Sequence, residues 1–260
     1  MSYVDANGGR LWVETEGSGS GVLFLHGGLG DLRLFEPQAR FLASRFRCIR
    51  YDLRLWGRSE TEGVEFSWVD DTIAVLDALG ADRVAVVGLS FGGGLAVDFA
   101  LAHPERLWAL VSLAGGVTGL PVDPYTEEQD AAFEKAAETG DLETAMQIDL
   151  DVWAPLGADD RMRELWRATP EARGVPDGAN PRPRPDAHER LEEIAVPTLV
   201  VVPTHDPPAQ QDVGRRLALA VPGAQLAELD TDHYLTLREA EQVNELLLAF
   251  LTAAAPQPFG

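Results

Sequence analysis

The sequence predicts an α/β fold: a mainly parallel sheet flanked by helices, with a helical insertion in the middle of the chain. Short, continuous apolar runs at 22–26 and 84–88 are typical of strands buried on both faces of a parallel sheet. Segments with helical spacing of apolar residues alternate with such runs, and this alternation favours right-handed βαβ units. Between 117 and 193 no run has the pattern of a strand, which predicts an all-helical insertion.

The elements before the insertion follow in order along the chain. Segments 3–6 and 10–16 flank Asn7, Gly8 and Gly9, and a glycine turn between two such segments predicts a β-hairpin. Further strands are expected at 22–26, 46–52, 84–88 and 107–115. Helices are expected at 37–45, 67–79 and 91–103. Gly80 and Pro104 follow the last two of these helices and are typical stop signals.

The insertion contains helical segments at 127–139, 141–154 and 159–168, followed by a proline-rich loop at 169–187. The alternation of strands and helices then resumes with a strand at 197–202, a helix at 209–220, a strand at 224–229 and a C-terminal helix. We therefore predict a core built from 1–116 and 194–260, and an inserted helical cap at 117–193.

Composition restricts the classes of partner. The chain has 21 basic and 42 acidic residues, a net charge of −21, and such a surface repels nucleic acid. Its apolar stretches are shorter than the roughly 18–20 residues that span a bilayer, and its N-terminus does not have the pattern of a secretory signal. The single cysteine, Cys48, excludes an intramolecular disulfide and fits a reducing cytoplasm. We expect a cytoplasmic protein that acts on a small molecule, with a homodimer left open as its assembly.

The pentapeptide Gly-Leu-Ser-Phe-Gly at 88–92 is the sharpest chemical signal, because it lies between a predicted strand and a predicted helix. In a G-x-S-x-G turn of this kind the serine has a strained backbone and an exposed hydroxyl, and the glycines avoid collisions with neighbouring backbone. The pattern predicts that Ser90 is a nucleophile. The alternative interpretation is a tight turn whose serine has no chemical role.

Four landmarks occur in a fixed order: HGG at 26–28, YDLRLWGRS at 51–59, GLSFGG at 88–93, and late acid and histidine segments. In these landmarks the sequence resembles the α/β-hydrolase superfamily over nearly the whole chain, most weakly across the insertion. The resemblance implies a mainly parallel, eight-stranded sheet and a helical cap. Segment 102–111 and the insertion are similar to those of small esterases, enol-lactonases and carbon–carbon-bond hydrolases. Haloalkane dehalogenases and epoxide hydrolases also resemble the chain, but they have aspartate in place of the serine.

The triad of this superfamily has the order nucleophile, acid, histidine. Asp206 ends a strand-like run where the acid loop of the family begins, and His233 lies between the last strand and the last helix. The resemblance implies that His233 takes the proton of Ser90 and that Asp206 orients the imidazole. Asp230 and Asp232 flank the histidine and are alternative acids. Asp232 stands where the family commonly has glycine.

Acyl transfer also needs N–H donors that face the developing oxyanion. The glycine loop after the first buried strand is expected to supply the backbone N–H of Gly28, and the helix after the nucleophile that of Phe91. Segment 51–59 departs from the family pattern, because Leu55 and Trp56 occupy places where the family usually has glycine and often histidine. Larger side chains there either narrow the pocket floor or fill core space.

Four further side chains are candidates for the substrate pocket. Trp153 and Trp166 belong to predicted helices of the insertion and either line an apolar chamber or serve packing between helices. Arg33 and Arg54 lie in loops expected near the pocket, where an arginine is able to bind a carboxylate. The alternative for both arginines is a solvated or salt-bridged role.

No metal site or cofactor is expected. The histidines are scattered, the H-E-x-x-H pattern is absent, and a single cysteine cannot form a thiolate cluster. The GGLG segment lacks the spacing and the lysine of nucleotide-binding loops. The expected mechanism therefore uses only side chains and backbone groups of the chain.

These observations predict a serine hydrolase that cleaves a small carboxylic ester or lactone through an acyl-enzyme on Ser90, His233 and Asp206. Two alternatives remain open. The first is hydrolysis of a carbon–carbon bond in a diketone by the same three residues. The second is a low-turnover, ligand-binding or sensor role for the same fold.

Overall fold

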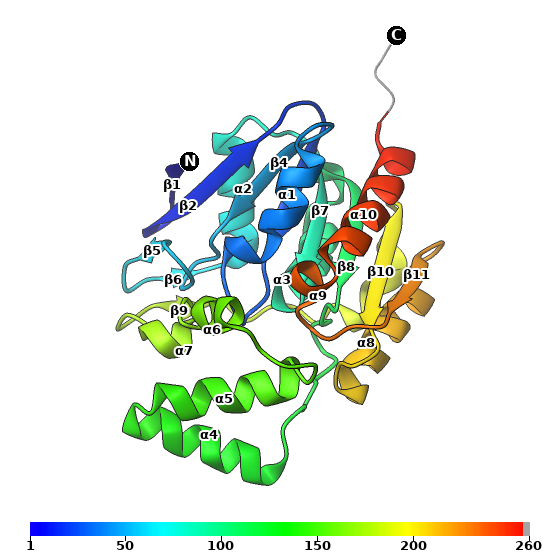
Figure 1. The fold of residues 1–260 in the computed structure, drawn as a ribbon. Coiled ribbons are helices and arrows are strands. Elements are labelled where there is room, and N and C mark those ends of the chain that lie inside the picture. Colours follow the sequence, from blue (N-terminus) through cyan, green and yellow to red (C-terminus); the bar gives the residue numbers. More distant parts are fainter. Residues whose placement is uncertain (257–260) are drawn as a thin grey trace.

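A nine-stranded sheet forms the centre of the molecule in the computed structural model, which describes residues 1–256 (Figure 1). Its strands are β1 (Ser2–Ala6), β2 (Gly9–Glu16), β3 (Gly21–Leu25), β4 (Arg47–Tyr51), β5 (Glu60–Thr61), β7 (Val84–Leu89), β8 (Leu107–Leu113), β10 (Thr198–Pro203) and β11 (Gln225–Leu229). Eight of them lie in the order β1-β2-β4-β3-β7-β8-β10-β11, and β5 pairs with β2. Pairing is parallel from β4 to β11 and antiparallel at β1 and β2. The predicted α/β fold with a mainly parallel sheet is confirmed. The expected number of eight strands is exceeded by one, because the two-residue β5 pairs antiparallel with β2 and is too short to give a strand pattern in the sequence.

Helices cover both faces of this sheet, as Figure 1 shows. They are α1 (Glu36–Leu42) and α10 (Ala240–Ala254) on one face, and α2 (Trp68–Ala78), α3 (Phe91–Ala102) and α8 (Pro208–Ala220) on the other. In β3, Val22 and Phe24 join the core under the first pair of helices, while Leu23 and Leu25 join the core under the other three. Successive strand side chains point to opposite faces, so one short apolar run contributes to two cores.

The insertion between β8 and β10 contains α4 (Glu127–Thr139), α5 (Leu142–Trp153), α6 (Asp160–Trp166) and α7 (Pro170–Arg173). We call residues 117–193 the helical segment; its helices lie below the sheet in the view of Figure 1. The N-terminus of α4 is defined by a capping box between Thr126 and Gln129, which satisfies two backbone N–H groups that have no partner inside the helix.

Two details differ from the sequence-based expectation. The proline-rich stretch 169–187 is not a plain loop, because it contains α7 and β9 (Asn180–Pro181), and β9 pairs with β6 (Glu65–Phe66). The helix expected at 37–45 begins earlier, with a 3₁₀ turn at Leu32–Phe35 whose first turn is capped by Asp31. Strand β9 depends on a distant partner strand, and the 3₁₀ turn depends on a single capping residue. Such short elements produce no periodic apolar pattern, so the sequence does not predict them.

The remaining short helices are Pro104–Arg106, His188–Glu193 and α9 (Leu235–Arg238). Within residues 1–256, none of the helices combines the length and the apolar character that a membrane crossing requires.

Candidate active site

Ser90 lies at the sharp turn between β7 and α3 and has φ +53° and ψ −115°. This backbone conformation costs a residue other than glycine about 1–3 kcal/mol of conformational free energy, so the surrounding packing must stabilise it. A Cβ atom on Gly88 would lie 2.2 Å from the carbonyl oxygen of Gly92, and one on Gly92 would lie 2.1 Å from that of Leu25. Both flanking glycines are therefore required by close backbone packing, as the pentapeptide predicts.

His233 follows β11 and precedes α9, and its Nδ1 lies 2.7 Å from Oδ2 of Asp206, which follows β10. Both side chains are buried. A carboxylate partner favours the tautomer with the proton on Nδ1, which leaves Nε2 able to accept a proton. Nε2 is buried and has no hydrogen-bond partner among residues 1–256. The pair therefore has the geometry of a histidine oriented by a carboxylate.

Ser90 and His233 line the same small cavity, together with Gly27, Gly28 and Tyr234. No hydrogen bond joins the serine hydroxyl to the imidazole within the described part of the chain. Catalytic hydrogen bonds are often long without substrate and shorten when it binds. The arrangement places an unpartnered imidazole nitrogen and a serine side chain at one cavity.

The two alternative acids have other partners. Asp230 is exposed and lies 2.7 Å from Nε2 of His205, which is also exposed. Asp232 is fully buried and accepts hydrogen bonds from Arg238 and from the backbone N–H groups of Tyr234 and Leu156. Of the three aspartates proposed from the sequence, Asp206 is the one that contacts the imidazole of His233.

The glycine loop lies directly against the nucleophile turn. A Cβ on Gly27 would be 3.3 Å from Cβ of Ser90, and one on Gly28 would be 3.9 Å from Cβ of Phe91. His26 stabilises this loop, because its Nε2 accepts the N–H of Leu53 and its Nδ1 lies 2.8 Å from the carbonyl oxygen of Gly27. Burial lowers the pKa of His26 to about 4, so this imidazole is neutral and has a structural role at neutral pH.

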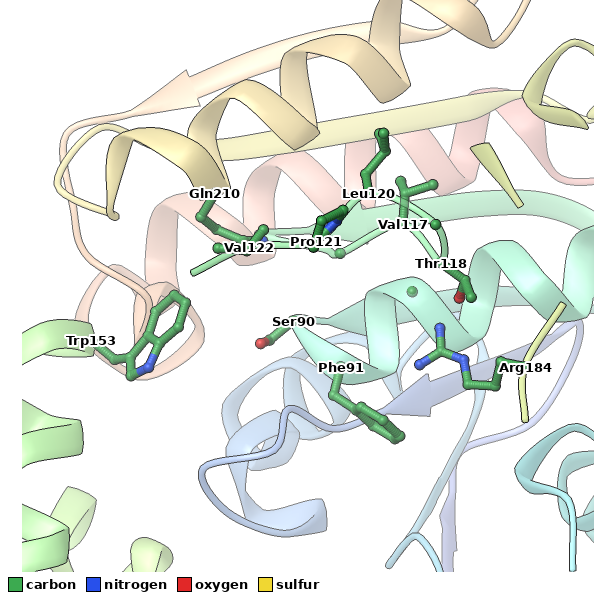
Figure 2. A pocket seen from close by; sticks show the side chains of 13 residues that line it. Ser90, Phe91, Val117, Thr118, Leu120, Pro121, Val122, Trp153, Arg184 and Gln210 are labelled. Atoms are coloured by element: carbon green, nitrogen blue, oxygen red, sulfur yellow. The ribbon is translucent and has the colours of Figure 1, made fainter. Parts of the chain in front are cut away.

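A cavity of about 490 Å³ opens beside Ser90 (Figure 2). Most of its lining is apolar; the polar side chains other than Ser90 are Thr118, Arg184 and Gln210. Nε of Arg184 donates to Asp98, and the guanidinium lies 5.1 Å from the ring centroid of Phe91. Arg184 is not among the pocket residues predicted from the sequence. The available signal was its place in a Pro-Arg-Pro-Arg-Pro stretch, in which proline restricts the backbone on both sides.

The pocket residues expected from the sequence separate into two groups. Trp153 lines the cavity, and its ring centroid is 4.3 Å from that of His233. Trp166 is buried and donates its Nε1–H to Asp149, so it serves helix packing rather than the cavity. Arg33 also lies away from the cavity, because its guanidinium pairs with Asp31 and Glu164 and lines a different depression.

Arg54 likewise has a structural role. It is fully buried and makes two hydrogen bonds to the carboxylate of Asp71, at 2.8 and 2.7 Å. Such a bidentate pair leaves few donors for a substrate carboxylate. Of the three arginines, Arg184 is the one that lines the cavity beside Ser90.

Comparison with known proteins gives the family of this chain. The family model described as the alpha/beta hydrolase fold matches residues 22–240. The chain belongs to the alpha/beta hydrolase family. A 2-hydroxy-6-oxononadienedioate/2-hydroxy-6-oxononatrienedioate hydrolase from Paraburkholderia phymatum is 30% identical, over 96% of this chain and 90% of that protein. A protein from Pseudomonas putida named 2-hydroxy-6-oxononadienedioate/2-hydroxy-6-oxononatrienedioate hydrolase 2 is also 30% identical, over 96% of this chain and 91% of that protein.

Solved structures agree on the fold. The enol-lactonase from Burkholderia xenovorans LB400 has a TM-score of 0.79 and 24% identity, over 96% of this chain and 100% of that one. A meta-cleavage product hydrolase from Pseudomonas fluorescens has a TM-score of 0.78 and 23% identity, over 98% of each chain.

One contact in this alpha/beta hydrolase predicts a clear effect on stability. Arg238 is the cationic partner of the buried Asp232 and also donates to the carbonyl oxygen of Gly157 in the helical segment. Replacing Arg238 by methionine leaves a buried carboxylate without its counter-charge, which we expect to lower the free energy of unfolding by about 2–4 kcal/mol. Urea unfolding measures this change. The matched variant Arg215→Met removes an exposed pair with Glu228 and should cost less than about 1 kcal/mol; equal losses in both variants would contradict the prediction.

Proposed function

We propose that this alpha/beta hydrolase is a serine hydrolase that cleaves a small carboxylic ester or lactone, with Ser90 as nucleophile, His233 as general base and acid, and Asp206 as the orienting acid. The observation that carries the proposal is the buried hydrogen bond between Nδ1 of His233 and Asp206, which leaves Nε2 free at the cavity that Ser90 lines. An ester or lactone needs no group beyond this triad and two oxyanion donors.

In the proposed reaction, Oγ of Ser90 attacks the carbonyl carbon while its proton moves to Nε2 of His233. The carbonyl oxygen takes the negative charge and faces the backbone N–H groups of Gly28 and Phe91. The intermediate collapses, and His233 returns the proton to the leaving alkoxide, which leaves an acyl group on Ser90. Water then attacks the acyl carbon while His233 takes its proton, and the acid departs as Ser90 regains a proton.

The helical segment is proposed to be the cap of this site. Thr118, Trp153 and Arg184 all come from the helical segment and line the cavity beside Ser90. A cover of this kind excludes water from the reacting atoms and strengthens electrostatic interactions among them. The cap also supplies Arg184, the one arginine among the described residues that line the cavity.

Arg184 supports a substrate that carries a carboxylate. Its guanidinium lines the cavity, and its Nε is engaged by Asp98. Nη2 lies over Gly94, where a Cβ would approach to 2.8 Å, so the absence of a side chain at Gly94 leaves room for this cation. A guanidinium that keeps free N–H donors beside an apolar chamber is well suited to bind a carboxylate.

The variant Arg184→Met tests the substrate class. A hydrogen bond to a charged group contributes about 1.5–3 kcal/mol, so KM for the acidic ester p-nitrophenyl succinate should rise about 10-fold to 100-fold. KM for the neutral p-nitrophenyl pentanoate should change by less than about threefold. Arg33→Met is the matched control, because its arginine lies away from the cavity. Equal effects of Arg184→Met on both esters would exclude a carboxylate-binding role.

Hydrolysis of a carbon–carbon bond is the second candidate, because relatives that are 30% identical to this chain are named as 2-hydroxy-6-oxononadienedioate/2-hydroxy-6-oxononatrienedioate hydrolases. This reaction uses the same nucleophile but must also protonate a carbon leaving group. The rate of hydrolysis of a vinylogous diketone is measured from the loss of its absorbance. It is compared with the rates of hydrolysis of the two esters. A higher kcat/KM for the diketone would favour the second candidate, and turnover of the esters alone would favour the first.

A further inference from the structure

The indole of Trp56 contacts the glycine loop and the first residue of α3. Its Nε1–H donates to the carbonyl oxygen of Gly28 at 2.8 Å, and its ring centroid lies 5.3 Å from that of Phe91. Gly28 and Phe91 are the two proposed oxyanion donors. One side chain therefore contacts both residues whose N–H groups would face the developing charge.

Gly28 needs such a contact because of its own chemistry. Glycine has no Cβ and rotates about φ and ψ more freely than any other residue. The N–H of Gly28 belongs to the peptide before its Cα and the carbonyl to the peptide after it, so fixing the carbonyl restricts the direction of the N–H. The hydrogen bond from Trp56 acts on this carbonyl.

The segment that carries Trp56 is joined to the glycine loop on either side of Gly28. The N–H of Leu53 donates to His26, and Oδ1 of Asp52 accepts the N–H of Leu32. These two bonds fix the ends of the glycine loop. The bond from Trp56 acts on Gly28 itself, between them.

The backbone next to Trp56 is strained. Leu55 has φ +85°, a left-handed conformation that is unfavourable for a residue with a side chain. Strain of this kind persists where the surrounding structure fixes the conformation, and it is concentrated at functional sites. Here the strained residue directly precedes the indole that contacts both oxyanion donors.

We propose that Trp56 is a positioning residue that holds the N–H groups of Gly28 and Phe91 in the geometry of an oxyanion hole. The inference rests on the proposed serine hydrolase function. In this proposal Trp56, which is not part of the triad, stabilises the transition state, because the negative charge on the carbonyl oxygen develops only there. Substrate binding in the ground state depends little on Trp56.

The variant Trp56→Phe keeps an aromatic ring but removes the N–H. Loss of a whole oxyanion donor lowers kcat about 100-fold to 1000-fold, so a loosened donor should lower kcat for p-nitrophenyl acetate about 10-fold, with KM within about twofold. Trp68→Phe is the matched control. Trp68 also contacts Phe91, but its Nε1–H donates to the backbone carbonyl oxygen of Arg54 at 3.2 Å and not to the glycine loop. The kcat of Trp68→Phe should therefore stay within about twofold of the unmodified protein.

A trifluoromethyl ketone gives a readout that a merely structural role would not change. Oγ of Ser90 adds to the ketone carbon, its proton goes to His233, and the negative oxygen occupies the oxyanion hole. Ki of this inhibitor should rise in Trp56→Phe by the same factor as kcat/KM falls, because both report transition-state contacts. A tryptophan analogue with sulfur in place of the indole N–H, inserted at position 56, removes the donor while it preserves the shape.

Two results would overturn the inference. The first is a kcat of Trp56→Phe that is no lower than that of Trp68→Phe. The second is an unchanged Ki of the trifluoromethyl ketone for the protein that carries the sulfur analogue at position 56. If Trp56→Phe fails to fold, the sulfur analogue alone decides. Failure of the proposed function looks different, because Ser90→Ala would then remain active. An inactive Ser90→Ala together with an unaffected sulfur analogue would reject the role of Trp56 alone.

Discussion

Replacement of Ser90 by alanine is expected to lower kcat/KM for p-nitrophenyl acetate by at least about 1000-fold, because removal of a serine nucleophile leaves only the oxyanion donors and binding. The loss should appear in kcat, since the hydroxyl forms a bond with the substrate only after binding. The structure supports this expectation through the strained turn at Ser90 and the two glycines that permit it.

The measurement is the initial rate of p-nitrophenol release by the purified variant. Alanine at 90 keeps the fold, since the turn depends on backbone packing around Gly88 and Gly92. Ser44→Ala is the matched control, because the hydroxyl of Ser44 is exposed and donates to the carbonyl oxygen of the nearby Phe41. Rates in Ser90→Ala equal to those in Ser44→Ala would reject Ser90 as the nucleophile.

The second large effect is expected from Asp206→Asn, which should lower kcat about 1000-fold to 10000-fold. An amide in place of the carboxylate no longer favours the proton on Nδ1 of His233, and it does not stabilise the imidazolium that forms when Ser90 gives up its proton. The 2.7 Å bond between two buried side chains makes this dependence strong.

Asp230→Asn is the matched control for this prediction. Asp230 lies close to His233 in the sequence, yet in the structure it pairs with the exposed His205. Its replacement should change kcat by less than about twofold. A loss in Asp230→Asn as large as in Asp206→Asn would show that the acid had been assigned to the wrong loop.

Much of the core was predictable because its signals are local. The apolar run at 22–26 and the pentapeptide at 88–92 each determine a buried strand or a turn by their own residues. The order of Ser90, Asp206 and His233 was available from the resemblance to the family, and the structure adds the bond between the last two. The catalytic role of all three stays a prediction that the variants test.

The cavity lining was less predictable, because it depends on contacts between distant segments. Arg184 reaches the cavity only because the stretch after β9 lies against α3, where Asp98 accepts its Nε–H. Arg33 and Glu164 are far apart in sequence but form an ion pair. This pair holds Arg33 away from the cavity, although its position in a loop had favoured it as a pocket residue. Asp232 departs from the family pattern, and its charge is balanced by the ion pair with Arg238, which the sequence pattern does not predict.

Trapping of the acyl-enzyme tests the central claim most directly. The protein is mixed with p-nitrophenyl acetate, quenched in acid during turnover, digested and mapped by mass spectrometry. The account predicts an acetyl group on Ser90 that is absent from the Ser90→Ala variant and strongly reduced in His233→Ala. Turnover of the ester with no acyl group on Ser90, or with the label on another residue, would contradict it.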